Sequence, residues 1–333
     1  MSEFSIIDEF FKPLGKFGSL LHPSSADIGI GDDGAVMTCP KGMQLVIVTD
    51  TLVEGVHFPL ETQPYDIAWK ALAVNLSDLA AMGAQPAFYS LGLSLPQSCA
   101  NEAFLSSFSK GLKGLSSIFD VPLVGGDTTK SDRLTLTVTA HGWVEPSHVL
   151  RRSNASVGDK IYVTGKIGDG ALALQAVLGN YPVSGVDDLV FEKFYRPMPR
   201  VELGLELKKV ANAAIDISDG LVADLSHLLD SSNVSAEIDY KRIPFSSSVE
   251  KYIGVTGDAW LPITGGDDYE LCFTLSDAEA TILEDKAKSG LLGVSISCIG
   301  KVIEKQEQPV VWLNRPLADK ECSEPLVKGY EHF

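Results

Sequence analysis

Short apolar runs alternate along the chain with longer stretches in which apolar residues recur at helical spacing. The short runs predict buried strands at residues 45–48, 88–95, 121–124, 134–144, 160–164, 213–217 and 269–274. The longer stretches predict helices at residues 66–82, 101–119, 169–178, 187–195, 200–210 and 220–229. The strand at 134–144 has a clear signal, because Leu134, Leu136 and Val138 alternate with threonines. Such a mixture of strands and helices predicts α/β or α+β architecture.

The length of the chain and a change in its composition predict two domains. A chain of 333 residues corresponds to about two domains at roughly 150 residues each. Between residues 147 and 159 the composition turns polar, so we place the boundary there and expect domains at 1–148 and 149–333. The hydrophobic fraction of 45% and the charged fraction of 21% are typical of globular proteins and exclude a disordered or fibrous chain.

The charge balance restricts the class of partner. Lys and Arg number 27 against 44 Asp and Glu, which gives a net charge of −17 and argues against a protein that binds nucleic acid or a membrane surface. The negative charge does not exclude a nucleotide ligand, because bound metal ions can invert the local charge. The chain has no run of 18 apolar residues, and the start of the sequence lacks the features of a signal peptide. Five cysteines without a CxxC pair favour reduced thiols, so we expect a cytoplasmic protein.

Carboxylates cluster with glycine next to the apolar runs. Glycine lets the backbone approach a ligand closely, and a hard divalent cation would neutralise the clustered aspartates. The alternative is that each aspartate caps a helix or a turn, or lies on a solvated helix face. The acidic segments are Gly31-Asp32-Asp33-Gly34, Thr49-Asp50-Thr51, Asn75-Leu76-Ser77-Asp78, Gly125-Gly126-Asp127-Thr128-Thr129, Asp216-Ile217-Ser218-Asp219-Gly220 and Gly265-Gly266-Asp267-Asp268.

Two familiar phosphate-binding motifs are excluded. Residues 29–34 match GxGxxG by letter, but no strand precedes them and two carboxylates inside the loop would repel a bare pyrophosphate. No GxxxxGK[ST] sequence occurs, so bound ATP would rely on metal ions to carry its phosphate charge.

The junction between the strand at 213–217 and the following helix is the best candidate for a shared cation. Asp216 and Asp219 lie three residues apart across it, and the amides at the start of the helix favour phosphate oxygens. The alternative is that Asp219 caps the helix. Arg152 is a candidate phosphate contact or a surface residue, His57 is a candidate ligand contact or a structural histidine, and Tyr330 is a candidate stacking residue or part of a frayed terminus.

Taken together, these motifs resemble the thiamine-monophosphate kinase family, which belongs to an ATP-dependent superfamily that includes aminoimidazole ribonucleotide synthetase and selenophosphate synthetase. The resemblance extends from about residue 4 to residue 333. Its most specific parts are the acidic segments above, the run Leu79-Ala80-Ala81-Met82-Gly83-Ala84 and Tyr269-Glu270-Leu271. One departure is Asp267, where the family often has glutamate.

The resemblance implies a two-domain α+β fold and phosphorylation of thiamine monophosphate to thiamine diphosphate with ATP. It implies mixed sheets flanked by helices in both domains, with the N-terminal sheet pairing in a homodimer. Several Mg²⁺ ions would be held by Asp33, the carbonyl of Val48, Thr49, Asp50, Asp78, Asp127, Asp216 and Asp219. ATP would contact Gly126, Asp127, Arg152 and Ser218, and thiamine monophosphate would contact His57, Asp267 and Tyr330.

The chemistry of the acceptor makes a general base unnecessary. A phosphate monoester is largely dianionic at neutral pH, because its second pKa is about 6. We therefore assign no catalytic residue and expect acidic side chains from both halves to converge on one cation-filled pocket that neutralises and aligns the two anions. The alternatives are a synthetase-like or hydrogenase-maturation-like member of the same superfamily, a metal-dependent phosphohydrolase, or an acidic divalent-cation-binding protein without catalysis.

Overall fold

The computed structural model describes residues 3–15 and 28–314, which form two compact units. The first contains residues up to Leu79, Ala84–Val149 and Tyr195–Pro197. The second contains Ala80–Gly83, Leu150–Phe194 and residues from Met198 onward. Each unit has its own mixed sheet with helices, which confirms the predicted two-domain α+β fold.

The first unit is built on a four-stranded sheet in the order β1-β4-β2-β3. Its strands are β1 (Gln44–Val53), β2 (Gln85–Leu95), β3 (Leu123–Lys130) and β4 (Thr135–Val144). β4 pairs antiparallel with β1 and β2, whereas β2 and β3 are parallel. The predicted strand ends at Thr49-Asp50 and at Gly125 were wrong, because strand pairing continues through both acidic segments.

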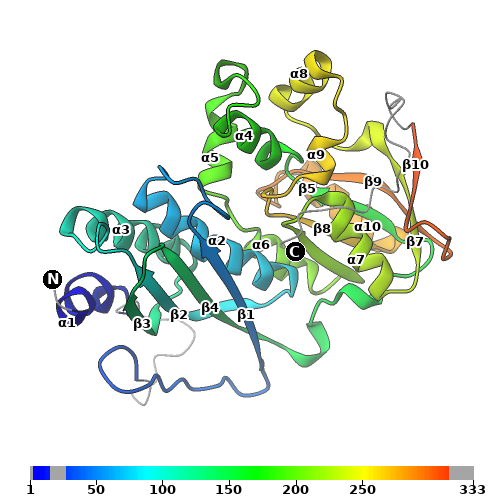
Figure 1. The fold of residues 1–333 in the computed structure, drawn as a ribbon. Coiled ribbons are helices and arrows are strands. Elements are labelled where there is room, and N and C mark those ends of the chain that lie inside the picture. The colour runs from blue at the N-terminus through cyan, green and yellow to red at the C-terminus, as the bar shows by residue number, and fades with distance from the viewer. Residues whose placement is uncertain (1–2, 16–27, 315–333) are drawn as a thin grey trace. The chain divides into compact units, whose positions relative to one another are not determined.

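Two long helices, α2 (Pro64–Ala81) and α3 (Glu102–Phe119), cover one face of this sheet (Figure 1). α2 is apolar on most sides, and its residues from Ile67 to Ser77 are all buried. The side chain of Asn101 caps α3 by accepting from the Phe104 amide. A short N-terminal segment adds α1 (Glu3–Ile6), η1 (Ile7–Phe11) and η2 (Lys12–Gly15).

The second unit is built on a six-stranded sheet in the order β10-β7-β9-β5-β8-β6. The strands are β5 (Lys160–Thr164), β6 (Ala213–Ile217), β7 (Ser235–Asp239), β8 (Glu270–Leu275), β9 (Ile296–Ile303) and β10 (Val310–Leu313). β10 and β7 are parallel, and the other pairs are antiparallel. The sequence did not predict β7, β9 and β10: polar residues interrupt the apolar runs of β7 and β9, and β10 is only four residues long.

Helices pack against the six-stranded sheet of the second unit. α7 (Leu221–Ser231) buries its leucines against Ile161, Val163 and Ile215 of the sheet. α10 (Asp277–Lys288) contacts β8, and its Glu284 accepts from the Tyr162 hydroxyl at 2.6 Å. The other elements are η3 (Pro146–His148), η4 (Arg152–Asn154), α4 (Asp169–Val177), η5 (Val183–Gly185), α5 (Asp188–Tyr195), α6 (Val201–Leu207), η6 (Tyr240–Arg242), α8 (Ser247–Thr256) and α9 (Leu261–Thr264).

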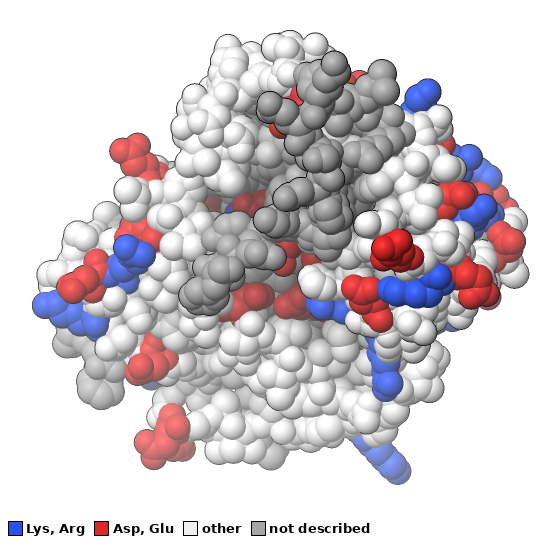
Figure 2. All heavy atoms as spheres, turned by 45° about the vertical axis from the view of Figure 1, so that its right-hand side comes forward, with Lys and Arg blue, Asp and Glu red and all other residues white. Residues whose placement is uncertain are grey.

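The distribution of charged side chains on the surface fits the excess of acidic residues in the sequence. On the face drawn in Figure 2, acidic and basic side chains are interspersed among uncharged ones, and the described residues form no continuous basic patch there. Across the described ranges, no helix combines the length and the apolar character that crossing a membrane requires.

Candidate active site

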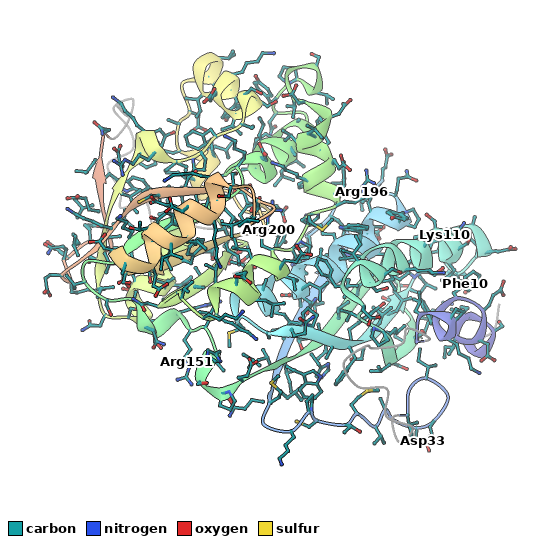
Figure 3. The ribbon with its side chains drawn as sticks, turned by 180° about the vertical axis from the view of Figure 1, so that it is seen from behind. Phe10, Asp33, Lys110, Arg151, Arg196 and Arg200 are labelled. Carbon is teal, nitrogen blue, oxygen red and sulfur yellow. The ribbon has the colours of Figure 1, made fainter. Side chains whose placement is uncertain are left out.

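The first unit contains a cavity of about 1030 Å³ that brings three predicted site residues together. Asp33 enters it from the long loop before β1 (Figure 3), and Gly126 and Asp127 enter it from β3. Apolar side chains of the N-terminal segment and the sheet, including Phe11 and Leu91, complete the walls.

The cavity is acidic. Its lining includes Asp8, Asp32, Asp33 and Asp127, and the only lysine or arginine among the described lining residues is Lys12. Lys12 donates to Asp8 at 3.1 Å. Within the described part of the chain, neither Asp33 nor Asp127 has a basic partner. An anionic ligand would therefore need a cation in this cavity.

The two glycines of the acidic segment in β3 differ in how much space a side chain would have. A Cβ on Gly126 would collide with the backbone carbonyl of Leu91 on the neighbouring strand β2. A Cβ on Gly125 would meet no atom within 4 Å. Gly126 is thus required by strand packing, whereas Gly125 borders open space in the cavity.

We expect Gly126→Ala to lower the free energy of unfolding by about 1–3 kcal/mol, because the added methyl displaces the backbone of β2. Gly125→Ala is the matched control and is expected to change it by less than about 0.5 kcal/mol. Urea unfolding of both variants measures the difference. Equal stabilities would contradict the close approach of β3 to β2.

On β1, Thr49 and Asp50 point to opposite faces of the sheet. The Thr49 hydroxyl donates to Thr139 at 3.1 Å on the exposed face. Val48 and Asp50 share the other face with Gly142, whose Cα lies beneath Leu79 of α2. The fold therefore directs the Asp50 side chain toward the helices and does not bring it together with that of Thr49.

Helix α2 carries the predicted residue Asp78, which is half-buried. The neighbouring Asn75 and Ser77 are fully buried, and the Asn75 amide donates to the Ala71 carbonyl at 3.0 Å. The alternative of a solvated polar face was wrong for Asn75, which is buried against the rest of the unit.

His57 lies just after β1 and has a defined tautomer. Its Nδ1 accepts from the Val53 amide at 3.0 Å. Because Nδ1 accepts, the proton of the neutral ring lies on Nε2.

In the second unit, the segment from Ser218 to Gly220 joins β6 to α7. Asp216, on β6, is only 4% exposed. The amides of Ser218, Asp219 and Gly220 all donate to one oxygen of Asp224, at 2.9, 3.0 and 3.1 Å. Of the amides at the predicted start of the helix, that of Gly220 is therefore already accepted by a carboxylate of the chain itself.

The capping alternative for Asp219 was also wrong. The N-cap position of α7 is Gly220, and no side chain caps the helix there. Burial raises the pKa of Asp224 to about 8, and the nearby charges of Asp216 and Asp219 add to the shift. The sequence analysis missed Asp224; its position four residues after the Asp219-Gly220 turn, inside an apolar helix, was the available signal.

The loop 265–269 packs directly on this junction and brings Asp267 close to Ser218. The Asp267 amide donates to the Ser218 carbonyl at 2.9 Å, and the Tyr269 amide donates to the Ile217 carbonyl at 2.8 Å. A Cβ on Gly266 would collide with the Ser218 carbonyl. Asp267 has φ 74°, and its side chain accepts from the Tyr269 hydroxyl at 3.0 Å.

Two further carboxylates after Asp267 have structural roles. Asp268 is half-buried and accepts the amides of Gly168 and Gly170 at the start of α4, at 2.8 and 3.1 Å. Burial raises the pKa of Asp268 well above its ordinary value, although these amides oppose the shift. Glu270 forms a buried pair with Arg200, whose Nε donates at 2.7 Å, and also accepts from the Thr164 hydroxyl at 2.5 Å.

Arg152 and Ser218 lie at opposite ends of α7. The Arg152 carbonyl accepts from Ser232, just after the last residue of the helix, whereas Ser218 precedes the first. The 11 residues of α7 span about 16 Å. Figure 3 labels the neighbouring Arg151, whose carbonyl accepts from the Ala214 amide near the start of β6. Tyr330 lies outside the described residues.

No group of three or more His, Cys, Asp or Glu side chains is placed as a ready-made metal site within the described ranges. Mg²⁺ is typically bound through one or two carboxylates together with waters and substrate phosphates. The pair Asp33 and Asp127, in one acidic cavity, has the chemistry of such a partial ligand set.

Comparison with known proteins identifies the class of protein first. Residues 31–144 match the AIR synthase related protein, N-terminal domain, and residues 156–312 match the AIR synthase related protein, C-terminal domain. The chain is therefore a two-domain AIR synthase related protein.

Similar proteins narrow the class further. The chain is 43% identical to thiamine-monophosphate kinase of Haemophilus influenzae over 335 residues, covering 100% of this chain and 98% of that protein. The crystal structure of thiamine-monophosphate kinase from Stenotrophomonas maltophilia K279a is 40% identical, has a TM-score of 0.82 and covers 95% of this chain and 98% of its own. A structure described as AaThiL complexed with AMPPCP and TMP is 30% identical, has a TM-score of 0.75 and covers 99% and 97%. The chain belongs to the thiamine-monophosphate kinase family.

Proposed function

We propose that this chain transfers the γ-phosphoryl group of ATP directly and in line to thiamine monophosphate, with Mg²⁺ neutralising the two anions. The overall reaction follows from the family: the chain is a thiamine-phosphate kinase that forms thiamine diphosphate. The acidic cavity of the first unit is the observation that carries the proposed mechanism, because Asp33 and Asp127 lie there without a basic partner among the residues that the structure describes.

We assign the ATP site in the first unit to this cavity. Its volume of about 1030 Å³ lies near the upper end of the usual range for small-molecule pockets, so it has room for a nucleotide. Phe11 and Leu91 supply apolar wall, while Gly126 and Asp127 supply a close backbone and a carboxylate. In the second unit, Ser218 and Arg152 remain the proposed nucleotide contacts.

We assign the metal ligands to the acidic positions of both units. When bound, Mg²⁺ polarises and neutralises phosphate oxygens and orients the transferred group. Asp33 and Asp127 fit this role by their position in an acidic cavity, and Asp216 fits it as a buried carboxylate close to other acids. The full proposed set is Asp33, the Val48 carbonyl, Thr49, Asp50, Asp78, Asp127, Asp216 and Asp219.

The residues of the chain position the acceptor and provide no general base. The phosphate oxygen of thiamine monophosphate is already a nucleophile at neutral pH, since its second pKa is about 6. His57 presents an Nε2–H donor that can hold a phosphate oxygen, because its Nδ1 accepts from Val53. Asp267 is the proposed contact in the second unit, and its side chain accepts from the Tyr269 hydroxyl at 3.0 Å. Tyr330 completes the proposed substrate contacts.

We also propose that the first unit forms a homodimer through its sheet. The face of the sheet opposite α2 and α3 carries Leu45 and Ile47, which are 43% and 59% exposed. The threonine pairs Thr49–Thr139 and Thr51–Thr137 lie on the same face. An exposed apolar strand at the edge of a sheet is a typical surface for association.

These assignments give the two predicted domains different roles. We assign ATP and Mg²⁺ binding and dimerisation to residues 1–148, and further metal, nucleotide and substrate contacts to residues 149–333. We place the protein in the cytoplasm, where its thiols would stay reduced; the four described cysteines Cys39, Cys99, Cys272 and Cys298 are all free.

An assay of ADP release tests the function. We expect ADP formation with MgATP and thiamine monophosphate, and ADP formation lower by at least about 100-fold with free thiamine or without acceptor, because the nucleophile is the phosphate oxygen. Chelation of divalent ions with EDTA is expected to abolish the signal. Equal ADP release without acceptor, accompanied by free phosphate, would indicate a phosphohydrolase instead.

A further inference from the structure

The buried carboxylate of Asp224 contacts three consecutive backbone amides and no described basic side chain. It is 3% exposed, and its Oδ2 lies 2.9, 3.0 and 3.1 Å from the amide nitrogens of Ser218, Asp219 and Gly220. One side chain thus fixes the whole segment between β6 and α7 from one side.

The other side of the same segment is fixed by the loop 265–269. The carbonyls of Ile217 and Ser218 accept from the amides of Tyr269 and Asp267. Gly266 lies so close to the Ser218 carbonyl that no side chain would fit between them. The segment is therefore held by its amides on Asp224 and by its carbonyls on the loop that carries Asp267.

The Oδ2 atom of Asp224 is occupied by these three amides. Two of the residues that it holds, Ser218 and Asp219, are the proposed nucleotide and metal contacts. A third, Gly220, has φ 115°, a conformation that requires glycine and that the amide contact with Asp224 stabilises.

We propose that Asp224 is a positioning residue for the kinase reaction: it sets the backbone of Ser218–Gly220, and through the Ser218 carbonyl it sets the backbone of Asp267. This inference rests on the proposed roles of Ser218, Asp219 and Asp267. It adds to those contacts a residue whose role is to hold their backbone in place.

The test compares Asp224→Ala and Asp224→Asn with a matched control at the opposite end of the same sheet. Asp159 is 4% exposed and accepts the Ser156 amide at 3.0 Å and the Asn212 side chain at 2.9 Å, next to the first residue of β5. Asp159→Ala therefore also removes a buried acceptor, but it leaves the Ser218–Gly220 segment intact. Melting temperatures, kcat and KM for MgATP and for thiamine monophosphate are measured for each variant.

We expect Asp224→Ala to reduce kcat/KM for MgATP by about 10- to 100-fold, the range that misplacement by about 1 Å produces. Asp224→Asn keeps an acceptor oxygen and is expected to recover most of this loss. Asp159→Ala is expected to lower the melting temperature while leaving both KM values unchanged. Wild-type kinetics in folded Asp224→Ala, or equal kinetic losses in Asp224→Ala and Asp159→Ala, would overturn the proposal.

A second readout does not depend on activity. Hydrogen exchange at the amides of residues 218–220 is expected to accelerate in Asp224→Asn and Asp224→Ala, while the amides of β6 stay protected. If Asp224→Ala does not fold, hydrogen exchange in Asp224→Asn carries the test, and unchanged exchange at residues 218–220 in that variant would overturn the proposal. Failure of the proposed function is separate, because the wild-type protein would then show no ADP release that depends on thiamine monophosphate.

Discussion

Asp127→Asn is expected to lower kcat by about 100- to 1,000-fold, because a neutral amide is a poor ligand for a cation that stabilises transition-state charge by several kcal/mol. The side chain keeps its size and lies exposed on β3, so the fold and the melting temperature should not change. Asp33→Asn, in the same cavity, is expected to behave in the same way. The measurement is steady-state ADP release over a range of Mg²⁺ concentrations, together with thermal unfolding.

Asp132→Asn is the matched control for this experiment. Asp132 is exposed in the turn between β3 and β4 and does not line the cavity. It is expected to keep wild-type turnover and Mg²⁺ dependence. If Asp127→Asn and Asp33→Asn both retained wild-type kinetics, the assignment of the cavity to metal-bound nucleotide would be wrong.

Arg200→Ala is expected to lower the free energy of unfolding by about 3–5 kcal/mol, because it leaves Glu270 charged, buried and uncompensated. Glu270 is 3% exposed in its side chain and Arg200 is 20% exposed. Burial alone would lower the pKa of Arg200, but the hydrogen bonds and charge of Glu270 raise it, so the guanidinium stays charged throughout the usual pH range. Urea unfolding followed by tryptophan fluorescence measures the loss.

The pair Lys160–Asp277 provides a control on the same sheet. Its atoms lie 3.2 Å apart, but the side chains are 35% and 82% exposed. Lys160→Ala is expected to change the free energy of unfolding by less than about 1 kcal/mol, because water screens this pair. The double variant Arg200→Leu/Glu270→Leu is expected to be more stable than Arg200→Ala, since it removes the unpaired charge. Equal losses in Arg200→Ala and Lys160→Ala would show that Glu270 is not isolated from water.

Strong local patterns were sufficient to predict the main helices and strands. Residues 134–144, where apolar and polar residues alternate, form β4. Residues 66–82 and 101–119, where apolar residues recur at helical spacing, form α2 and α3. Weak patterns were not sufficient: β7 contains Ser235 and Glu237, and its place in the sheet depends on pairing with β9, which comes about 60 residues later.

The sequence likewise predicted some features of the candidate site and not others. The acidic segments were identified from the amino-acid sequence, and the cavity of the first unit does bring Asp33 and Asp127 together. The acidic segments look alike in the sequence, but their aspartates have different surroundings. Asp268 accepts amides at the start of α4, whereas Asp127 has no partner among the described residues. A single sequence does not distinguish an aspartate satisfied by backbone amides from one that is open to a cation.

The α+β class, the acidic glycine-containing segments and the resemblance to the kinase family could be read from the sequence, because each depends on the order of residue types over short distances. Which carboxylates are buried and already hydrogen-bonded depends on the folded structure. Asp224 accepts the amides before its own helix, and Gly266 fits beneath Ser218, because segments far apart in the chain pack within van der Waals contact. Burial and hydrogen-bond partners are properties of that packing and not of neighbouring letters.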